Sequence, residues 1–210
     1  MKWILGNRGV AMALAALTAA LAAGGADAAI IKGSLAFVGN AFADEARILP
    51  PGGAIPHGAA TVEAAVTGPL LSSYIDAFDM GEILEVTFTD NAVVNGPGND
   101  LVVFEALAVN LFRVAVYASG EAAPSAYQSY VPVAQGIIDG MPMNAALIDL
   151  SDYGLPPDAE VTRLLVQSED QNGTEIAGLG ALNSVPEPAS ALLIGLGAVS
   201  LLARRRTRPV

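Results

Sequence analysis

The sequence contains no cysteine and only one histidine, His57, in a stretch rich in proline and glycine. A disulfide therefore cannot form, and a zinc site would lack its usual ligands. Nucleophilic catalysis also finds little support, because there is no cysteine, no Gly-x-Ser-x-Gly segment and no second histidine. The glycine-rich stretch 95–99 lacks the lysine and the following helix of a phosphate-binding loop.

Basic residues are scarce between the two ends of the chain. Residues 29–185 contain nineteen acidic residues and four basic ones, a net charge of 4 − 19 = −15, whereas the whole chain has −11. The four basic residues are Lys32, Arg47, Arg113 and Arg163. Such an acidic surface repels phosphate backbones, so we expect no nucleic-acid partner. It favours solubility and divalent cations.

The N-terminus has the three parts of a secretion signal. Lys2 and Arg8 provide the positive start, residues 9–23 are apolar, and Ala26-Asp27-Ala28 is a small-x-small cleavage site. An uncleaved anchor is the alternative, but the apolar run is shorter than the roughly 18 to 20 residues of a membrane span. We therefore predict a signal peptide over residues 1–28, cleaved between Ala28 and Ala29.

The C-terminus, residues 185–210, combines a proline motif, an uncharged span and a basic end. Residues 189–203 carry no charge, and as a helix they would reach about 22 Å. They show no polar face, which favours a transmembrane helix over a buried core helix with a basic cap. Basic residues stay on the cytoplasmic side, so the domain before them should face outward. The flanking residues are Val185, Pro186, Glu187 and Pro188 on one side and Arg204, Arg205 and Arg206 on the other.

These three parts, in this order, resemble the PEP-CTERM sorting signal of Gram-negative bacteria. The resemblance implies that an exosortase, a membrane transpeptidase-like protease, recognises the tail and that the protein is delivered to the cell surface or the extracellular matrix. It also implies an association with exopolysaccharide and biofilm. The tail specifies a location and says nothing about what the domain does there.

Residues 29–184 have the period of two that is typical of strands. Apolar and polar residues alternate over 84–89 and 112–119, and less cleanly over 161–167, as expected for a strand buried on both faces. Turn sequences separate the strands, and no amphipathic helix is sustained. The fold class is therefore mostly β: a single antiparallel β-sandwich, jelly-roll-like, flanked by a signal helix and a transmembrane helix.

Further strands are less clearly marked. The stretch 40–60 is rich in glycine, proline and alanine, and we expect it to be a long surface loop. The additional strand candidates are residues 30–38, 61–66, 101–105, 129–133 and 145–150.

The middle of the domain resembles a β-sandwich module that is common among bacterial surface proteins. The resemblance rests on residues 80–91, 95–105 and 145–184. In such modules the last strands end in a sequence like Asp-x-Asp-Ala-Val-Gly-Ala. Here Glu175 and Ala177 occupy the positions where aspartates are expected, so the resemblance alone implies no metal or ligand site in this chain.

Acidic and amide residues cluster at three predicted strand ends. Calcium prefers such oxygen ligands on loops between strands, and our first choice is Asp90, Asn99 and Asp100. Turn chemistry, in which Asp and Asn bond their own backbone, is the favoured alternative, because the domain has no dense Asp-x-Asp-x-Asp ligand series. The clusters are Asp90 with Asn91, Asn99 with Asp100, and Glu169 and Asp170 with Asn172.

The sequence as a whole predicts a non-enzymatic surface or matrix protein. A carbohydrate-binding module is the alternative, because sugar sites use exposed aromatic rings and the domain offers tyrosines, although tyrosines at strand edges more often serve packing. A secreted hydrolase that uses paired carboxylates ranks third. The tyrosines are Tyr74, Tyr117, Tyr127, Tyr130 and Tyr153.

Overall fold

The computed structural model describes residues 29–37, 41–50, 53–76, 81–170 and 173–186. The predicted signal peptide up to Ala28 and the predicted membrane helix over 189–203 lie outside these ranges, as do Glu187, Pro188 and the arginines 204–206. Within the described ranges, no helix is long and apolar enough to cross a bilayer.

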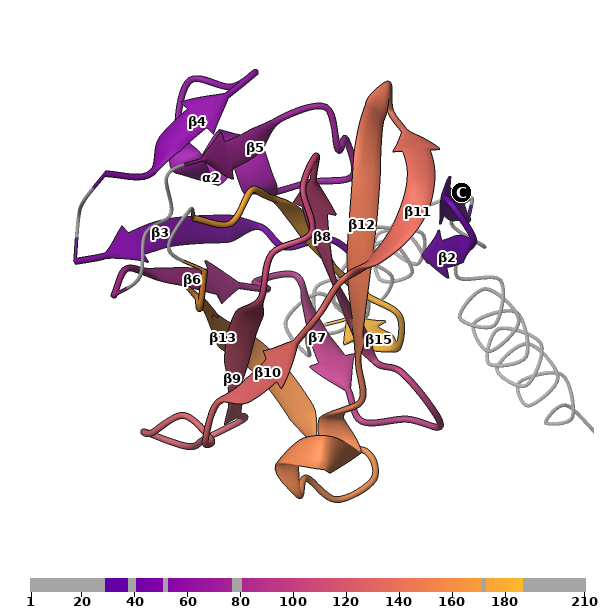
Figure 1. Ribbon diagram of the computed structural model, residues 1–210. Helices are drawn as coiled ribbons and strands as arrows, with labels where there is room; N and C mark the ends of the chain where they lie inside the picture. The colour runs from indigo at the N-terminus through magenta and orange to yellow at the C-terminus, as the bar shows by residue number, and fades with distance from the viewer. Residues whose placement is uncertain (1–28, 38–40, 51–52, 77–80, 171–172, 187–210) are drawn as a thin grey trace, which may run out of the picture.

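Two antiparallel sheets form the body of the domain (Figure 1). A small hairpin of β1 (Ile30–Lys32) and β2 (Leu35–Phe37), a short helix α2 (Val62–Val66) and a 3-10 helix η1 (Leu150–Tyr153) complete it. The seven-stranded sheet contains β3 (Glu45–Leu49), β6 (Ile83–Thr87), β7 (Asn91–Val94), β9 (Phe112–Ala118), β10 (Gln128–Tyr130), β13 (Glu160–Ser168) and β15 (Ser184–Pro186). The six-stranded sheet contains β4 (Ile55–His57), β5 (Tyr74–Asp76), β8 (Leu101–Ala106), β11 (Val133–Ile138), β12 (Met141–Ile148) and β14 (Ile176–Ala181).

The strand order is that of a jelly roll. The six-stranded sheet contains the order β5-β14-β8-β12, and the seven-stranded sheet contains β6-β13-β9-β10. When these eight strands are numbered along the chain, the two orders are 1-8-3-6 and 2-7-4-5, the double Greek key of a jelly roll. The predicted fold class, an antiparallel jelly-roll-like sandwich, is confirmed. Strands β3, β4, β11 and β15 lie at the edges of the two sheets, and β7 lies between β13 and β15.

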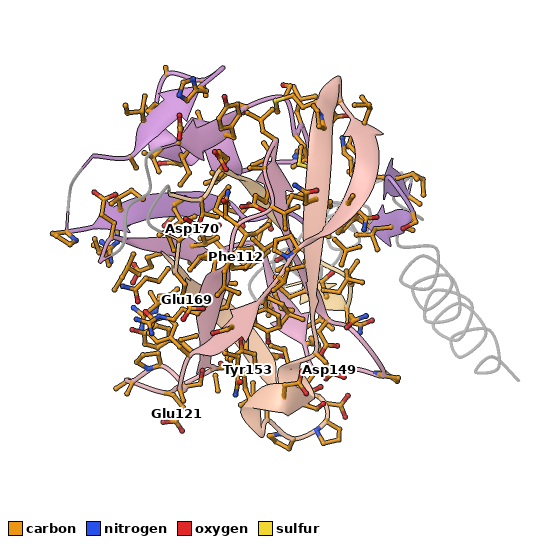
Figure 2. The ribbon with its side chains drawn as sticks, viewed as in Figure 1. Phe112, Glu121, Asp149, Tyr153, Glu169 and Asp170 are labelled. Atoms are coloured by element: carbon orange, nitrogen blue, oxygen red, sulfur yellow. The ribbon has the colours of Figure 1, made fainter. Side chains whose placement is uncertain are left out.

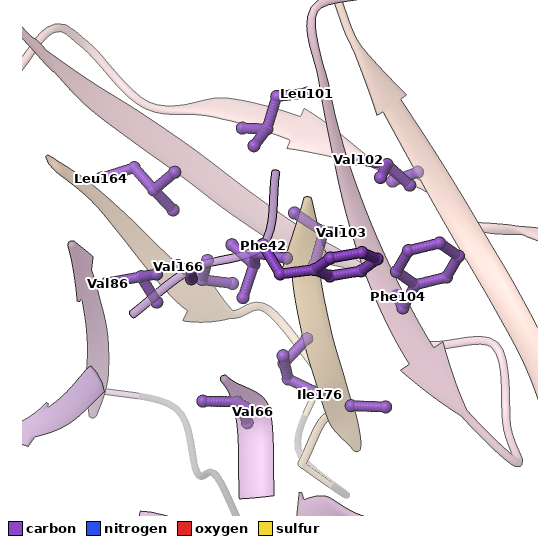
Figure 3. Packing of buried hydrophobic residues seen from close by; sticks show 14 of the residues in the cluster. Phe42, Val66, Val86, Leu101, Val102, Val103, Phe104, Leu164, Val166 and Ile176 are labelled. Carbon is purple, nitrogen blue, oxygen red and sulfur yellow. The ribbon is translucent and has the colours of Figure 1, made fainter. Parts of the chain in front are cut away.

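The main core lies between the sheets. Figure 3 shows Val86, Leu164 and Val166 of the seven-stranded sheet near Leu101, Val103 and Ile176 of the six-stranded sheet. Each of these residues is almost completely buried. Fully burying such a side chain stabilises the fold by about 1.5 to 3 kcal/mol, which explains how a domain without disulfides can be stable.

The six-stranded sheet is covered on its other side as well. Every residue of β8 and β14 is buried, the pattern of strands that are packed on both faces. Phe37, which ends β2, packs there against Phe42 and Phe104, with ring centroids 4.8 and 6.0 Å away. Gly180 makes room for this cluster, because a Cβ atom at that position would lie 2.7 Å from the Phe37 ring.

Three expectations for the first third of the domain are wrong. The strand candidate 30–38 is the hairpin of β1 and β2, because the chain turns at Gly33, which has a positive φ. Residues 61–66 form no strand: Val62–Val66 is helix α2, and the Thr61 side chain caps it by accepting a hydrogen bond from the Ala64 N–H. Alanine and glutamate favour a helix, and this local preference prevails here. The stretch 40–60 is not one long loop, because it contains β3 and β4. Both are edge strands with few buried residues, so their hydrophobic pattern is weak.

Candidate functional site

The structure separates the three residues that we selected for calcium. Asn99 and Asp100 follow β7 and Asp90 precedes it, so that the four residues of β7 lie between them. Four residues of a strand span about 13 Å, more than one calcium ion can bridge with ligands at 2.3 to 2.6 Å. The structure therefore brings Asn99 and Asp100 together and leaves Asp90 at the opposite end of β7.

Asp100 is a fully buried hydrogen-bond acceptor. Its Oδ1 accepts the Gly96 N–H at 2.8 Å and the Asn183 Nδ2–H at 2.7 Å, and its Oδ2 accepts the Leu150 N–H at 2.9 Å. Three segments that are distant in sequence meet on this one carboxylate. Its role in the structure is to join the loop after β7 to the start of η1 and to the chain after β14.

Asp90 lies beside a different carboxylate, that of Asp44. One Asp44 oxygen accepts the backbone N–H groups of Thr89 and Asp90 at 2.6 and 3.4 Å. Burial raises the pKa of Asp90, and the charge of Asp44 raises it further. This pair holds the turn between β6 and β7.

The third predicted cluster lies where β13 ends, as the labels of Glu169 and Asp170 in Figure 2 indicate. Its third member, Asn172, is outside the described residues. Among the residues that the structure describes, no group of three or more His, Cys, Asp or Glu side chains could hold a metal ion. Calcium binding stays a prediction, and one that amide and carbonyl oxygens would have to support.

A different set of charged residues gathers on the outer face of the seven-stranded sheet. Arg113 and Tyr117 alternate along β9 with the core residues Val114 and Val116, so they point away from the core. Neighbouring strands add residues to this face according to their register. We call it the arginine–tyrosine face, and it comprises Arg47, Glu85, Arg113, Tyr117, Tyr127, Arg163 and Gln167.

Two arginines of this face lie over tyrosine rings. The Arg163 guanidinium carbon is 3.6 Å from the centroid of the Tyr117 ring, and that of Arg113 is 4.8 Å from the Tyr127 ring. Each contact is a cation–π interaction worth about 0.5 to 1 kcal/mol at an exposed site. Arg113 also donates Nε–H and Nη2–H bonds to Gln167 Oε1, at 3.1 and 2.8 Å.

A buried glutamate organises the other end of the face. Glu85 is 7% exposed and accepts the Arg47 Nε–H at 2.8 Å, while Arg163 Nη1 lies 3.9 Å from its second oxygen. These residues line a hollow of about 510 Å³ together with Glu45, Glu63 and Thr87. The hollow is open and polar, with charges of both signs on its walls.

A second pair of carboxyls, one buried and one half-buried, lies near the end of β8. Glu105 is completely buried and accepts the Asn110 N–H at 3.1 Å, while the Asn110 side chain donates to Glu175 Oε2 at 2.7 Å. Burial raises the pKa of Glu105 to about 7. Burial, followed by the charge of Asp76, also raises the pKa of Glu175. Because Glu105 has no exposed surface, its carboxyl is not open to a substrate, and of this pair only Glu175 is partly exposed.

The tyrosines proposed as sugar platforms have other contacts in the structure. Tyr130 and Tyr153 share a hydrogen bond between their hydroxyl groups, at 3.2 Å. Tyr74 stacks on His57, with ring centroids 4.9 Å apart. Tyr117 and Tyr127 support the two arginines described above. The alternation in the sequence predicts strands that contain Arg113 and Arg163. It does not predict that these two residues are neighbours, because the pairing of β9 with β13 depends on the long-range topology.

The last strand of the domain is β15, and it pairs with β7. Ser184 lies opposite Val93, Val185 opposite Ala92 and Pro186 opposite Asn91. The chain thus leaves the sandwich at an edge of the seven-stranded sheet, one residue before Glu187.

The end of the chain matches a known family model. Residues 184–206 match the PEP-CTERM protein-sorting motif, which confirms the resemblance drawn from the prolines and arginines of the tail. The motif covers the tail and not the sandwich. No curated protein matches the chain.

Proposed function

We propose that this chain is a non-enzymatic component of the bacterial surface or extracellular matrix, sorted by an exosortase and associated with exopolysaccharide. The observation that carries the proposal is the sorting motif at residues 184–206, which indicates an exosortase-sorted surface protein. Our proposal adds three points to this: that the protein belongs to the matrix, that it catalyses no reaction, and that it is associated with exopolysaccharide.

The position of the motif supports processing without loss of the fold. Its first residues form β15, and the jelly-roll strands β5 to β14 all precede it. A cut beyond Pro186 would therefore leave every strand of the sandwich in place. The acidity of the domain, with −15 over residues 29–185, suits a protein that must remain soluble after release.

Two other functions are alternatives to this proposal. A carbohydrate-binding module gains support from the hollow and the charged groups of the arginine–tyrosine face. A secreted hydrolase would need two carboxyls on either side of a sugar bond. Turnover of a panel of bacterial exopolysaccharides by the purified chain would favour the hydrolase over the other two.

Sorting can be tested by reversing the charge of the tail. Replacement of Arg204, Arg205 and Arg206 by glutamate should disturb orientation and retention, because basic residues normally stay on the cytoplasmic side. We expect the wild-type chain to lose residues 189–203 in a host with exosortase, and to keep them in a strain that lacks the enzyme. Mass spectrometry of the surface form measures the difference. An intact tail on surface protein in the exosortase host would reduce the motif to a membrane anchor.

The predicted cleavage of the N-terminal signal peptide is tested on the same sample. N-terminal sequencing should begin at Ala29, since cleavage is predicted after Ala28. A mature protein that still begins at Met1 would show that the N-terminal segment is an anchor.

A further inference from the structure

We propose that the arginine–tyrosine face binds a polysaccharide that carries carboxylates, that is, a polymer of uronic acid units. This inference rests on the proposed function, because a protein of the extracellular matrix meets such polymers. It goes further in naming the face, the residues and the chemistry of the ligand.

The distribution of basic residues is the first argument. Residues 29–185 have four basic side chains, and all three arginines lie on this one face. The fourth, Lys32, is 7% exposed and pairs with Asp139, so a ligand cannot reach it. In a domain with a charge of −15, a polyanion finds accessible basic groups on the arginine–tyrosine face, and most directly at Arg113, because Arg47 and Arg163 also face the carboxylate of Glu85.

The contacts of Arg113 are the second argument. Arginine has five N–H donors, and Arg113 uses two of them on the neutral oxygen of Gln167. Its charge is thus oriented by a neutral partner and by the Tyr127 ring, and three donors remain for a ligand. A planar guanidinium that is held in one orientation is suited to bidentate binding of a carboxylate.

The spacing of the two stacked arginines is the third argument. Tyr117, whose ring lies under the Arg163 guanidinium, is four residues from Arg113 along β9, which separates the two backbone positions by about 13 Å. A single sugar acid cannot reach both positions, but an extended polymer with a carboxylate on each unit can. The face should therefore bind long chains and not monomers.

The tyrosines define what the face does not recognise. The rings of Tyr117 and Tyr127 are each covered by a guanidinium group, so these covered faces are not open to stack on a sugar. Recognition should depend on the charge of the ligand, and a neutral glycan of the same backbone should bind weakly.

The experiment uses the full chain, purified in mild detergent and immobilised, with polygalacturonate as the probe. The fully methyl-esterified polymer is the matched control, since it has the same backbone without the charges, and galacturonic acid tests the need for length. We expect binding of the polymer only, weakened by salt through screening of the charges. Arg113→Gln and Arg163→Gln should each weaken binding about tenfold or more, because each removes a charge-assisted hydrogen bond.

Two further variants separate recognition from general charge. Arg113→Lys keeps the charge but loses the flat fork, so it should weaken binding almost as much as Arg113→Gln. Ala134→Glu on β11 makes the same change in net charge at an exposed position of the other sheet, and should leave binding unchanged. Melting curves of all variants report whether the fold is preserved.

Three results would overturn the proposal: equal binding of the acid and ester polymers, binding by the arginine variants at the wild-type level, or equally tight binding of inorganic polyphosphate. None of these would affect the sorting of the tail, which is measured separately by mass spectrometry. A failure of sorting with intact polymer binding would in turn refute the proposed function alone.

Discussion

Glu105 is the residue whose ionisation should affect stability most directly. Its carboxyl is completely buried, and its pKa of about 7 lies above its ordinary value of 4.5. A raised pKa in the folded state means that the stabilising contribution is complete below pH 4.5 and is lost as the pH rises through 7. Glu175, Asp170 and the Asn110 amide face the same group.

Glu105→Gln should therefore stabilise the protein at high pH and not at low pH. The amide has the shape of the acid and can still accept the Asn110 N–H bond, but it never ionises. We expect the melting temperature of the variant, relative to the wild type, to be higher at pH 8 than at pH 4. The control is Glu121→Gln, at an exposed loop position. A pH-independent difference between Glu105→Gln and wild type would contradict the assignment.

Gly180 shows how closely the second layer of the core is packed. Alanine at this position would place its Cβ atom 2.7 Å from the Phe37 ring, closer than real contacts allow. Gly180→Ala should destabilise the fold by about 1 to 3 kcal/mol, the usual cost of overpacking. Urea unfolding measures this, with Gly53→Ala as the control, since the nearest atom to a Cβ there is 3.9 Å away. In a double-mutant cycle, Phe37→Leu should recover part of the loss, and strict additivity would argue against the contact.

At the scale of elements, β7 separates Asp90 from Asn99 and Asp100, and this separation determines which variants can test calcium binding. Asp100→Ala would destabilise the protein in any case, because it leaves the Gly96 and Leu150 N–H groups without their acceptor. Asp90→Asn and Asn99→Ala are the better variants.

If calcium binds, about 2.7 kcal/mol of stabilisation is expected at a hundredfold excess over Kd. The melting temperature should then rise by roughly 5 to 10 °C against chelator, and the rise should be lost in the variant that removes a ligand. Equal melting temperatures would leave Asp100 with its structural role alone.

The central strands could be predicted from the sequence because their burial pattern is regular. In β9 the core residues Phe112, Val114 and Val116 are spaced by two, and β13 repeats the pattern with Leu164 and Val166. In β3 the alternation covers only Glu45 to Ile48, and only Ile48 is buried, so the strand signal there is short and weak. In α2, five residues are too few for a helical period, and the local signals are the helix preference of alanine and glutamate and the capping by Thr61.

The candidate site was harder to predict than the fold. Alternation places Arg113 on the outer face of β9 and Arg163 on the outer face of β13, but it does not say which strands are neighbours. The register, with Arg163 opposite Tyr117 and Gln167 opposite Arg113, is set by long-range pairing. The sorting motif required no such pairing, because its parts are contiguous in the sequence.

At the scale of the whole molecule, the domain between the two ends of the chain is strongly acidic, with nineteen acidic and four basic residues over 29–185. Repulsion among nineteen acidic residues over 29–185 destabilises the compact state, and salt screens it. An increase in ionic strength from about 10 mM to 150 mM shortens the Debye length from about 30 to 8 Å. We expect the melting temperature to rise by about 2 to 4 °C, as for 1 kcal/mol in a domain of this size. Glu121→Lys, which changes an exposed loop position by two charges, should reduce this salt dependence. A melting temperature that falls with salt would show that favourable ion pairs dominate instead.

Strand β15 has a mechanical consequence for a protein tethered by its C-terminus. A pull on any tether beyond Pro186 reaches β15 first, and this strand has three residues and pairs with β7. Its detachment would extend the chain by about 10 Å while β14, paired with both β5 and β8, still resists. Drag from a bound polymer would therefore detach the terminal strand before it strains the jelly roll, and β15 would pair again when the load is removed.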